Sequence, residues 1–581
     1  MLVCDYITQY LLDKGIQDVF GYPGGMVTYL IDSFQKAADM HAHLTYNEQG
    51  ASFCACSYAQ TSDKVGVAYA TSGPGATNMV TGLCNALFDS IPVIFIIGQV
   101  NTYELKQDKN IRQHGFQETD IVCMVKNFTK YSAMIKNAND IKYHLDKAFY
   151  FAQSGRPGPV LLDIPMNIQC SDVKVKELKP FVPNKKQNSK YDSYDTIRNI
   201  LIDSLQKSKR PVILAGNGIN IAKVKKYFQK FVENINIPVL TSMIAVDLVE
   251  HDSPDYYGFI GSYGHRYANF ALAKSDLIIS LGSRMDIRQT GSDLRIFQEG
   301  VTIVRIDVDD NEFKNKICDD QINIYADLKD IMPQLAGDSA FLYGGRFNKW
   351  REQCDYYKKE LYGIDEMFYN KTIAKISGII PQDSVITTDV GQNQVWVAQS
   401  FRVKKNQRIL FSGGHGAMGY SLPAAIGAYY NSKKPVFCFS GDGGLQMNIQ
   451  ELQYIVREKL PIKIILLNNN ALGMIRHFQE MYFKGNYTQS LTGKGYMPPD
   501  FEKVFNAYGI SSVKINELKD VDGIRDRLLD KEAVLIHIER TEETYVYPKL
   551  EYMHPINDQA PLLERELFDK LNKYSNNEQE Y

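Results

Sequence analysis

The stretch VFCFSGDGG, residues 436–444, combines five residues typical of a buried strand with a glycine-rich turn that holds one acid, Asp442. A helix-like segment follows, and a second apolar run, IKIILL at 462–467, ends at the asparagine triplet 468–470. A strand–helix–strand unit places two parallel strands in one sheet, so both polar turns reach the same carboxyl edge. Open α/β sheets bind their ligands at that edge. The sequence therefore predicts an α/β fold with a ligand site at these two turns.

The residues of the two turns suit magnesium and a diphosphate. Asp442 and the amide oxygen of Asn469 are hard oxygen ligands of the kind that Mg²⁺ prefers. Glycines let backbone N–H groups approach phosphate oxygens, and the N-terminus of a following helix favours their negative charge. Gly, Asp and Asn are also common turn residues, so either turn alone is typical of an ordinary connection. Their position after two buried strands with one helix between them favours a binding site.

The same alternation of apolar runs and helical periodicity extends through the chain, which predicts three consecutive doubly wound parallel-sheet domains. The blocks are residues 1–172, 190–345 and 367–550, with a polar connection at 182–195 and a C-terminal tail at 551–581. Besides the two strands above, strands are expected at 65–69, 93–97, 211–215, 277–281, 302–306 and 385–388.

The composition argues against several kinds of partner. A formal net charge of -2 over 581 residues gives no electrostatic reason to expect nucleic acid or an anionic membrane. Apolar runs such as 91–97 fall well short of the roughly 18 residues of a membrane span. An acid in the opening residues, MLVCDY, comes too early for a signal peptide. Nine cysteines, an odd number, are not typical of a disulfide framework, so we expect a cytoplasmic protein.

Residues 414–419, GHGAMG, form a second glycine-rich pattern. They satisfy the dinucleotide fingerprint GxGxxG after a possible strand at 408–411, and Asp442 falls about 20 residues onward. An NAD-dependent dehydrogenase would leave the asparagine triplet and the first block without a role, so it is the weaker alternative. Metallohydrolase and serine hydrolase chemistry lack their HExxH, CxxC and GxSxG patterns.

Further motifs occur in the order of a known family. Glu48 opens a predicted helix, where an acid is ordinarily just a good electrostatic choice. The motifs around it are TSGPGATN (71–78), Gln99, FQE (116–118), GRPGPV (155–160), TDVGQ (388–392), SGGHGAMG (412–419) and QMNIQEL (446–452). With the two turns above, they resemble the acetolactate synthase branch of the thiamine-diphosphate (ThDP) enzymes over residues 1–550. The resemblance implies pyrimidine-binding, central and diphosphate-binding domains, with active sites between the subunits of a homodimer or homotetramer.

The resemblance also implies roles for single residues. Glu48 would hydrogen-bond N1′ of the cofactor's aminopyrimidine, and Gln117 matches a second catalytic position. Met418 would keep the cofactor bent, while the carbonyl of Gly416 would accept from the 4′-amino group. The metal ligands would be Asp442, Asn469 and the backbone carbonyl of Ala471. The other cofactor-binding positions would be Val390, Gly391, Gln392, Asn393, Gly441, Gly443, Gly444, Gly473, Met474 and Ile475.

Two further groups of residues match family positions less specifically. Phe116, Arg288 and Phe478 match the reaction cavity and its entrance, although an exposed Arg or a packed Phe would be an ordinary feature. A flavin is the third candidate cofactor. The positions that would contact FAD are Arg156, Gly216, Gly218 and Arg284.

The implied reaction is decarboxylation of a 2-oxo acid, with pyruvate as the expected donor, and transfer of the acyl carbanion to an acceptor. Four departures from the family pattern affect the acceptor: Met166 replaces a usual Lys, Ile287 an acid, Asn393 a common His and Phe478 a frequent Trp. The alternative is therefore a carboligase that transfers an acetyl unit to a keto-sugar nucleotide. A catalytically inactive binding scaffold is the non-enzyme alternative, but the chain keeps its key acids and amide.

Overall fold

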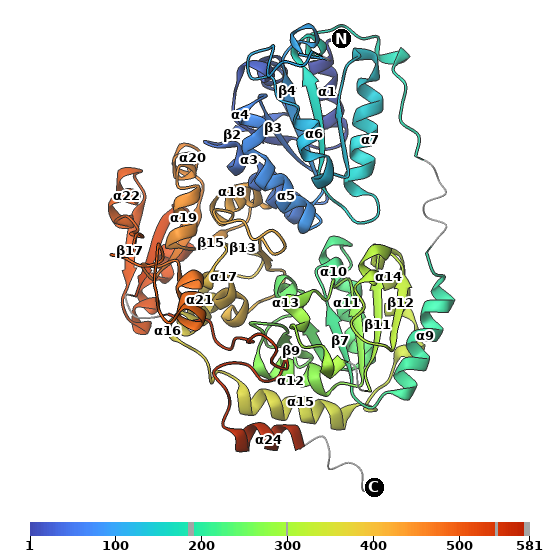
Figure 1. The fold of residues 1–581 in the computed structure, drawn as a ribbon, viewed down its shortest axis with the longest axis vertical. Coiled ribbons are helices and arrows are strands. Elements are labelled where there is room, and N and C mark those ends of the chain that lie inside the picture. The colour runs from blue at the N-terminus through green and yellow to red at the C-terminus, as the bar shows by residue number, and fades with distance from the viewer. Residues whose placement is uncertain (108, 184–190, 298–299, 541–543, 574–581) are drawn as a thin grey trace. The chain divides into compact units, whose positions relative to one another are not determined.

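The computed structural model describes residues 1–107, 109–183, 191–297, 300–540 and 544–573. The chain forms two compact units. The first unit comprises Met1–Asn184, Asp383–Gln394 and Arg408–Glu543, and the second comprises Lys185–Gln382, Val395–Gln407 and Thr544–Tyr581. Three six-stranded sheets lie in these units, and every strand pairing within them is parallel (Figure 1). The predicted α/β fold with three parallel sheets is confirmed.

The first sheet has the strand order β2-β1-β3-β4-β6-β5. Its central strands β3, β4 and β6 are buried along their whole length, as parallel strands covered by helices require. The strands are β1 (Asp18–Gly21), β2 (His41–Leu44), β3 (Gly66–Ala70), β4 (Val93–Gln99), β5 (Tyr131–Met134) and β6 (Val160–Pro165). The helices are α1 (Val3–Asp13), α2 (Thr28–Lys36), α3 (Glu48–Thr61), α4 (Pro74–Asn78), α5 (Val80–Phe88), α6 (Ile121–Val125), α7 (Ile141–Gln153) and α8 (Met166–Gln169).

The other sheet of the first unit has the order β14-β13-β15-β16-β18-β17. Strands β15 and β16 are direct parallel neighbours, as the opening motif predicts. The strands are β13 (Val385–Thr388), β14 (Arg408–Leu410), β15 (Val436–Gly441), β16 (Ile462–Asn468), β17 (Ser511–Ile515) and β18 (Val534–Glu539). The helices are α18 (Ser421–Ser432), α19 (Asp442–Met447), α20 (Glu451–Arg457), α21 (Gly473–Phe483), α22 (Phe501–Ala507) and α23 (Arg525–Leu529). Helix α17 (Gln392–Ser400) begins in this unit, and its residues from Val395 onward belong to the second unit.

One apolar core joins these two sheets, because helices α3 and α18 pack closely against each other. The approach is tight enough to require a glycine: a Cβ added at Gly427 would overlap the carbonyl oxygen of Cys54. The Sγ of Cys54 also lies 3.0 Å from the carbonyl oxygen of Pro423. All nine cysteines of the chain are free thiols, in keeping with the predicted lack of a disulfide framework.

The second unit holds the sheet β12-β11-β10-β7-β8-β9 and its own core. The strands are β7 (Pro211–Ala215), β8 (Val239–Thr241), β9 (Tyr256–Phe259), β10 (Leu277–Leu281), β11 (Thr302–Asp307) and β12 (Gln321–Tyr325). The helices are α9 (Tyr194–Lys207), α10 (Gly218–Ile221), α11 (Lys225–Ile235), α12 (Arg266–Lys274), α13 (Ile287–Thr290), α14 (Leu328–Gly337), α15 (Asn348–Leu361), α16 (Phe368–Ile379) and α24 (Arg565–Lys573).

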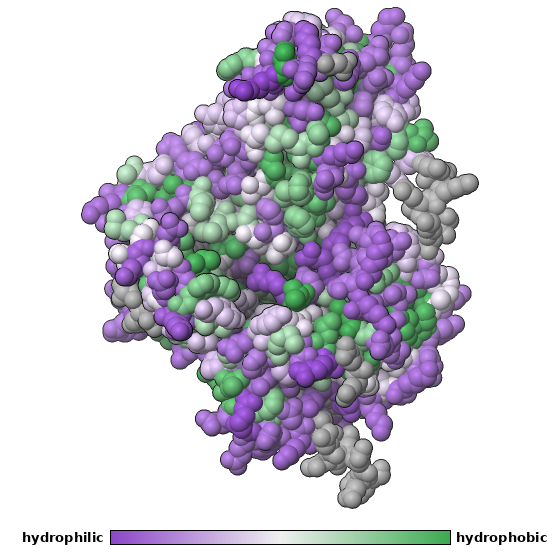
Figure 2. Space-filling model, in the orientation of Figure 1, coloured by the Kyte–Doolittle hydropathy of each residue, from purple (hydrophilic) through white to green (hydrophobic). Residues whose placement is uncertain are grey.

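Hydrophilic residues cover most of the surface visible in Figure 2, with hydrophobic residues in smaller patches between them. Within the described ranges, every helix is too short or too polar to span a membrane.

Candidate active site

The topological switch of the β14–β17 sheet lies between β13 and β15, because the chain runs from β13 outward to β14 and then returns to the other side of β13. Ligands of open α/β sheets bind beside such a switch point, at the carboxyl ends of the strands. The turns after β13 and β15 flank it, and the turn after β16 follows on the next strand. The structure therefore gathers the predicted diphosphate and metal residues at one edge.

Asp442 is the buried acid of this edge, with a side chain that is 2% exposed. Its Oδ2 accepts the backbone N–H of Ala471 at 3.1 Å and the hydroxyl of Tyr496 at 2.9 Å. Burial raises the pKa of Asp442 to about 6. A buried carboxyl held only by neutral donors favours its protonated form, so a cation bound here would replace a proton.

Asn469 lies beside Asp442 at the end of β16. Its Oδ1 accepts the N–H of Ala471 at 3.3 Å, and its Nδ2 donates to Oε1 of Gln392 at 2.8 Å. A Cβ added at Gly473 would overlap the Gln392 side chain. The predicted ligands Asp442 and Asn469 thus both accept from the N–H of the third, Ala471, and Gln392 from the β13 turn bonds Asn469.

Asp389, which was quoted within the TDVGQ motif but given no role there, connects the turn after β13 to the segment before helix α18. It is fully buried, and its carboxylate accepts the N–H groups of Val390, Gly419 and Ser421 and the Ser421 hydroxyl, each at 2.9 Å. A Cβ added at Gly444 would overlap the Asp389 carboxylate. Gly391 has φ +131, a conformation that only glycine adopts easily. These contacts explain why glycines and an acid recur around the switch point.

The 412–420 segment carries Met418 and precedes helix α18. Gly416 has φ +68, and the Cε of Met418 would lie 3.3 Å from a Cβ added at Gly443. The carboxylate of Asp89 accepts the N–H groups of Gly413 and Gly414 at 3.0 and 2.7 Å. The residue that directly follows helix α5 therefore supports the segment, and the next helix begins only at Ser421.

Glu48 begins helix α3 and is 8% exposed. Its Oε2 accepts the amide Nδ2 of Asn78 at 2.9 Å, and a Cβ added at Gly75 would lie 3.2 Å from its Oε1. The TSGPGATN motif therefore supplies both the space beside this carboxylate and its hydrogen-bond donor. Asn78 was part of the quoted motif, but its role follows only from the fold.

Glu451 links helix α3 to the β14–β17 sheet. Its Oε1 accepts the N–H of Tyr46 at 2.9 Å, just before the helix begins, and burial raises its pKa to about 8. The neighbouring Asn448 donates through Nδ2 to Oε1 of Gln49 at 3.0 Å. The QMNIQEL motif, which contained both residues, thus fixes the start of the helix that bears Glu48.

The predicted substrate residues are not enclosed together. The side chain of Phe116 is 78% exposed, and the Phe478 ring, 50% exposed, packs against Tyr482 with a centroid distance of 4.7 Å. Met474 lies in the same helix, α21, as the half-exposed Ile475. Gln117 adopts the left-handed conformation, with φ +63. The structure places these residues at surfaces of the first unit.

The predicted flavin residues have local structural roles. The N–H of Gly216 donates to the carbonyl of Leu281 at 3.0 Å, and that of Gly218 to Gly282 at 3.1 Å. A Cβ added at Gly216 would overlap the Gly282 carbonyl, so close packing alone requires a glycine there. Within the second unit, Arg284 lies 3.3 Å from Asp286, while Arg288 lies over the ring of Tyr263 with its Cζ 5.8 Å from the centroid.

Arg156 belongs to the first unit, where its Nε donates to Ser90 at 2.9 Å.

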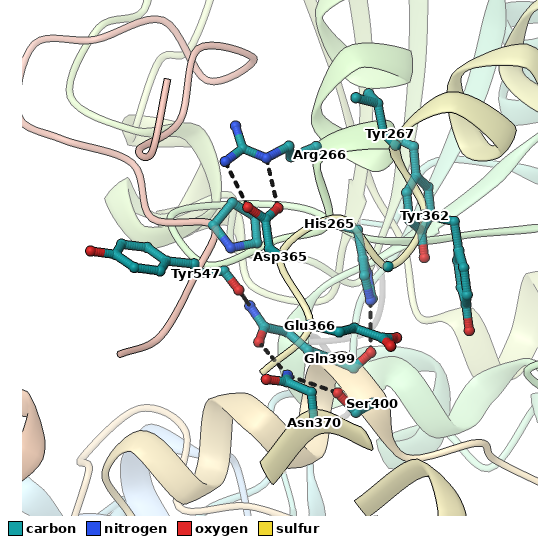
Figure 3. Close-up of a pocket in the computed structure, with 13 residues that line it drawn as sticks. His265, Arg266, Tyr267, Tyr362, Asp365, Glu366, Asn370, Gln399, Ser400 and Tyr547 are labelled. Atoms are coloured by element: carbon teal, nitrogen blue, oxygen red, sulfur yellow. Dashed lines mark hydrogen bonds and ion pairs between the residues drawn. The ribbon is translucent and has the colours of Figure 1, made fainter. Parts of the chain in front are cut away.

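A small pocket in the second unit is drawn in Figure 3, and its polar groups largely satisfy one another. Arg266 forms a two-pronged ion pair with Asp365 at 2.7 and 2.9 Å. His265 contacts the carbonyl of Gln399 through Nε2 at 2.9 Å, and burial lowers the pKa of this histidine to about 4. We interpret this pocket as a structural feature of the second unit, where several of its segments pack together.

Comparisons with known proteins agree with the order of the three sheets. Residues 1–124, 199–335 and 389–538 match, respectively, the N-terminal TPP binding domain, the central domain and the C-terminal TPP binding domain of thiamine pyrophosphate enzymes. The acetolactate synthase isozyme 2 large subunit of Escherichia coli is 33% identical over 550 residues, which cover 94% of this chain and 96% of that protein.

Two further relatives come from distant organisms. The acetolactate synthase large subunit of Lactococcus lactis is 34% identical, with 94% of this chain and 93% of that protein covered. Acetolactate synthase 1, chloroplastic, of Zea mays is 34% identical over 90% of this chain and 83% of that protein. Matches of this extent, together with the three sheets, show that the chain belongs to the thiamine pyrophosphate enzyme family.

Proposed function

We propose that this protein is a ThDP- and Mg²⁺-dependent enzyme that decarboxylates pyruvate and joins the resulting two-carbon unit to a second 2-oxo acid, as an acetolactate synthase does. The observation that carries the proposal is the buried carboxyl of Asp442 beside the amide of Asn469, at the switch point of a parallel sheet. The names of the relatives support the same reaction.

The residues at the switch point fit a magnesium diphosphate. Asp442 would provide the anionic ligand, Asn469 an amide oxygen and Ala471 its carbonyl, the hard oxygen donors that Mg²⁺ prefers. A Cβ added at Gly391 or Gly441 would lie 3.5 or 3.2 Å from the Asn393 amide nitrogen, so glycine at these positions keeps the backbone beside that amide accessible to phosphate oxygens. Val390 and Gln392 follow strand β13, and Gly443 follows strand β15, so all three belong to the turns that flank the switch point.

ThDP, when bound, supplies the carbanion chemistry. Glu48 would hold the aminopyrimidine through a charge-assisted hydrogen bond, worth about 1.5–3 kcal/mol. Asn78 engages one oxygen of that carboxylate, and the other would face the cofactor. Met418 would support the bent cofactor, and Gln117 would contact the reacting substrate.

The acceptor is proposed as a 2-oxo acid, and a keto-sugar nucleotide is the other outcome to be tested. Met166 begins α8, where a Lys is usual, and Ile287 is 67% exposed where an acid is usual. Changes in an apolar pocket are worth about 1–3 kcal/mol, which is enough to shift acceptor preference by roughly 10- to 200-fold. These substitutions thus allow a changed acceptor without selecting one.

We propose no chemical role for FAD in this reaction, and its binding stays a prediction. The amides of Gly216 and Gly218, two of the positions predicted to contact FAD, donate to backbone carbonyls. Arg284 is the remaining candidate anchor, and the visible absorption of a flavin in the purified protein would reveal the cofactor. We also propose a cytoplasmic homodimer or homotetramer with active sites between subunits, which mass measurement in solution will test.

The deciding experiment is product analysis. The purified protein, with ThDP and Mg²⁺, is given pyruvate alone and then pyruvate with 2-oxobutyrate, aldehydes or keto-sugar nucleotides, and the products are identified by mass spectrometry. We expect acetolactate from pyruvate alone. Exclusive formation of a branched sugar would replace the acceptor in this proposal, and absence of any carbon–carbon product would reject it.

A further inference from the structure

The turn that bears Gln117 is held in an unusual conformation. Gln117 has φ +63, in the left-handed region that residues with a Cβ rarely adopt. Gly73 lies directly opposite, and a Cβ added there would come within 2.9 Å of the Gln117 Cβ. A conformation of this kind persists only where surrounding contacts enforce it.

Gln99 supplies one such contact from the end of β4. Its side chain is fully buried, and its Nε2 donates both to the Thr119 carbonyl at 2.9 Å and to Oδ2 of Asp163 at 3.0 Å. Its Oε1 accepts the N–H of Val100 at 3.0 Å. Both N–H groups and the oxygen of this amide are therefore used, and one of them holds a carbonyl two residues after Gln117.

Asp163 determines the orientation of that amide. It lies on β6, is fully buried, and pairs in register with Ile97 of β4. Within the described chain its Oδ1 has no hydrogen-bond partner, an arrangement that is rare for a buried carboxyl. A carboxylate can only accept hydrogen bonds, so the amide NH₂ group of Gln99 must point toward Asp163. The amide oxygen then points away and accepts the N–H of Val100.

The charge state of Asp163 agrees with this geometry. Burial raises its pKa to about 7, and the carboxylate of Asp120, the charged group that faces it, acts in the same direction. In either protonation state Oδ2 can accept from Gln99. The contact with the amide therefore does not depend on a full buried charge.

We propose that Gln99 is a positioning residue for the reaction: oriented by Asp163, its amide holds the Thr119 carbonyl and thereby fixes the left-handed turn that presents Gln117. This inference rests on the proposed function, in which Gln117 contacts the reacting substrate. It adds a residue pair, 64 positions apart in sequence, whose role is to orient a catalytic group.

Two variants separate the contact with Thr119 from the stability of the buried pair. Gln99→Glu keeps the size of the side chain and, at a pH where the new carboxyl is ionised, cannot donate to Thr119 or to Asp163. The exchange Gln99→Glu with Asp163→Asn restores a donor–acceptor pair between the two positions and still leaves Thr119 without a donor. The matched control is Gln169→Glu, since Gln169 is also a buried amide that donates to two carbonyls, those of Met26 and Ile164.

Hydrogen exchange of the peptide spanning 113–121 tests the physical contact, whatever the reaction. We expect faster exchange in Gln99→Glu and in the paired exchange, but not in Gln169→Glu. The paired exchange should regain thermal stability relative to Gln99→Glu. Unchanged protection of this peptide in both Gln99 variants would overturn the inference.

Kinetics test the role in catalysis. Displacement of a catalytic group by about 1 Å costs roughly 100-fold in rate, so we expect kcat for carbon–carbon bond formation to fall about 10- to 100-fold in both Gln99 variants. In a Gln117→Ala background the same changes should have little further effect, because residues that act as a unit are not additive. Full recovery of kcat in the paired exchange, or additive losses, would refute positioning. A wild-type protein that forms no product would instead refute the proposed function.

Discussion

Glu451 offers a test of how the two sheets of the first unit are joined at helix α3. The side chain is fully buried, its Oε1 holds the N–H of Tyr46 at 2.9 Å, and its Oε2 has no partner within the described ranges. Burial raises its pKa from 4.5 to about 8. The folded chain therefore keeps this proton at pH values where the unfolded chain has lost it.

The direction of the pH dependence follows from this shift. A carboxyl whose pKa rises on folding stabilises the protein fully below its unfolded pKa, and that stabilisation is lost as the pH rises toward the folded pKa. Each pH unit within the interval corresponds to about 1.4 kcal/mol. Between pH 5 and pH 8 the free energy of unfolding should thus fall by about 4 kcal/mol relative to a side chain that stays neutral.

Glu451→Gln provides the neutral side chain and keeps an acceptor for Tyr46. We expect the Tm of wild type to fall relative to that of the variant between pH 5 and pH 8, by several degrees. Tm is compared rather than a free energy, because a chain with two units does not unfold in two states. Glu458→Gln, which changes a partly exposed acid at the end of the same helix, is the control. If the Tm of wild type and that of Glu451→Gln change equally with pH, the prediction that Glu451 is protonated in the folded protein is refuted.

Three further outcomes are expected. Asp442→Ala should remove the anionic metal ligand, so calorimetry should show much weaker ThDP binding in the presence of Mg²⁺; equal affinity with and without chelator would contradict the metal assignment. Glu48→Gln should fold normally but slow hydrogen–deuterium exchange at the cofactor's C2 by orders of magnitude, and a wild-type exchange rate would remove Glu48 from the mechanism. Asp365→Ala should destabilise the second unit by about 3–5 kcal/mol and lower its Tm, because it leaves the buried Arg266 without its ion pair. The control Asp319→Ala removes an exposed ion pair and should leave the Tm unchanged. Equal Tm values for the two variants would contradict a structural role for the Arg266–Asp365 pair.

Local sequence patterns predicted the central strands well. A strand buried on both faces of a parallel sheet is a continuous apolar run, which can be recognised in the sequence without knowing the neighbouring strands. The strands at 211–215, 277–281 and 385–388 have the predicted limits, while β4 continues to Gln99 beyond the predicted 97. Strands such as β5 and β17 were not predicted. Their burial is incomplete, and edge strands with mixed residues carry a weaker pattern.

The meeting of the two polar turns at one sheet edge was also predictable, because these turns follow directly after two strands whose pairing the strand–helix–strand rule fixes. The supporting contacts were not. Glu451 reaches Tyr46 across 405 positions, and Gln99 reaches Asp163 across 64. Such contacts depend on the order of strands and on which helix packs where, which periodicity does not encode. The left-handed turn at Gln117 was equally invisible, because glutamine is not a residue that marks such a turn.

The most direct test of the central claim is the release of CO₂ from pyruvate by the metal-free, cofactor-free protein after separate and combined addition of ThDP and Mg²⁺. We expect release only when both are present, accompanied by a carbon–carbon product. Release without ThDP, or no release with both, would contradict the account.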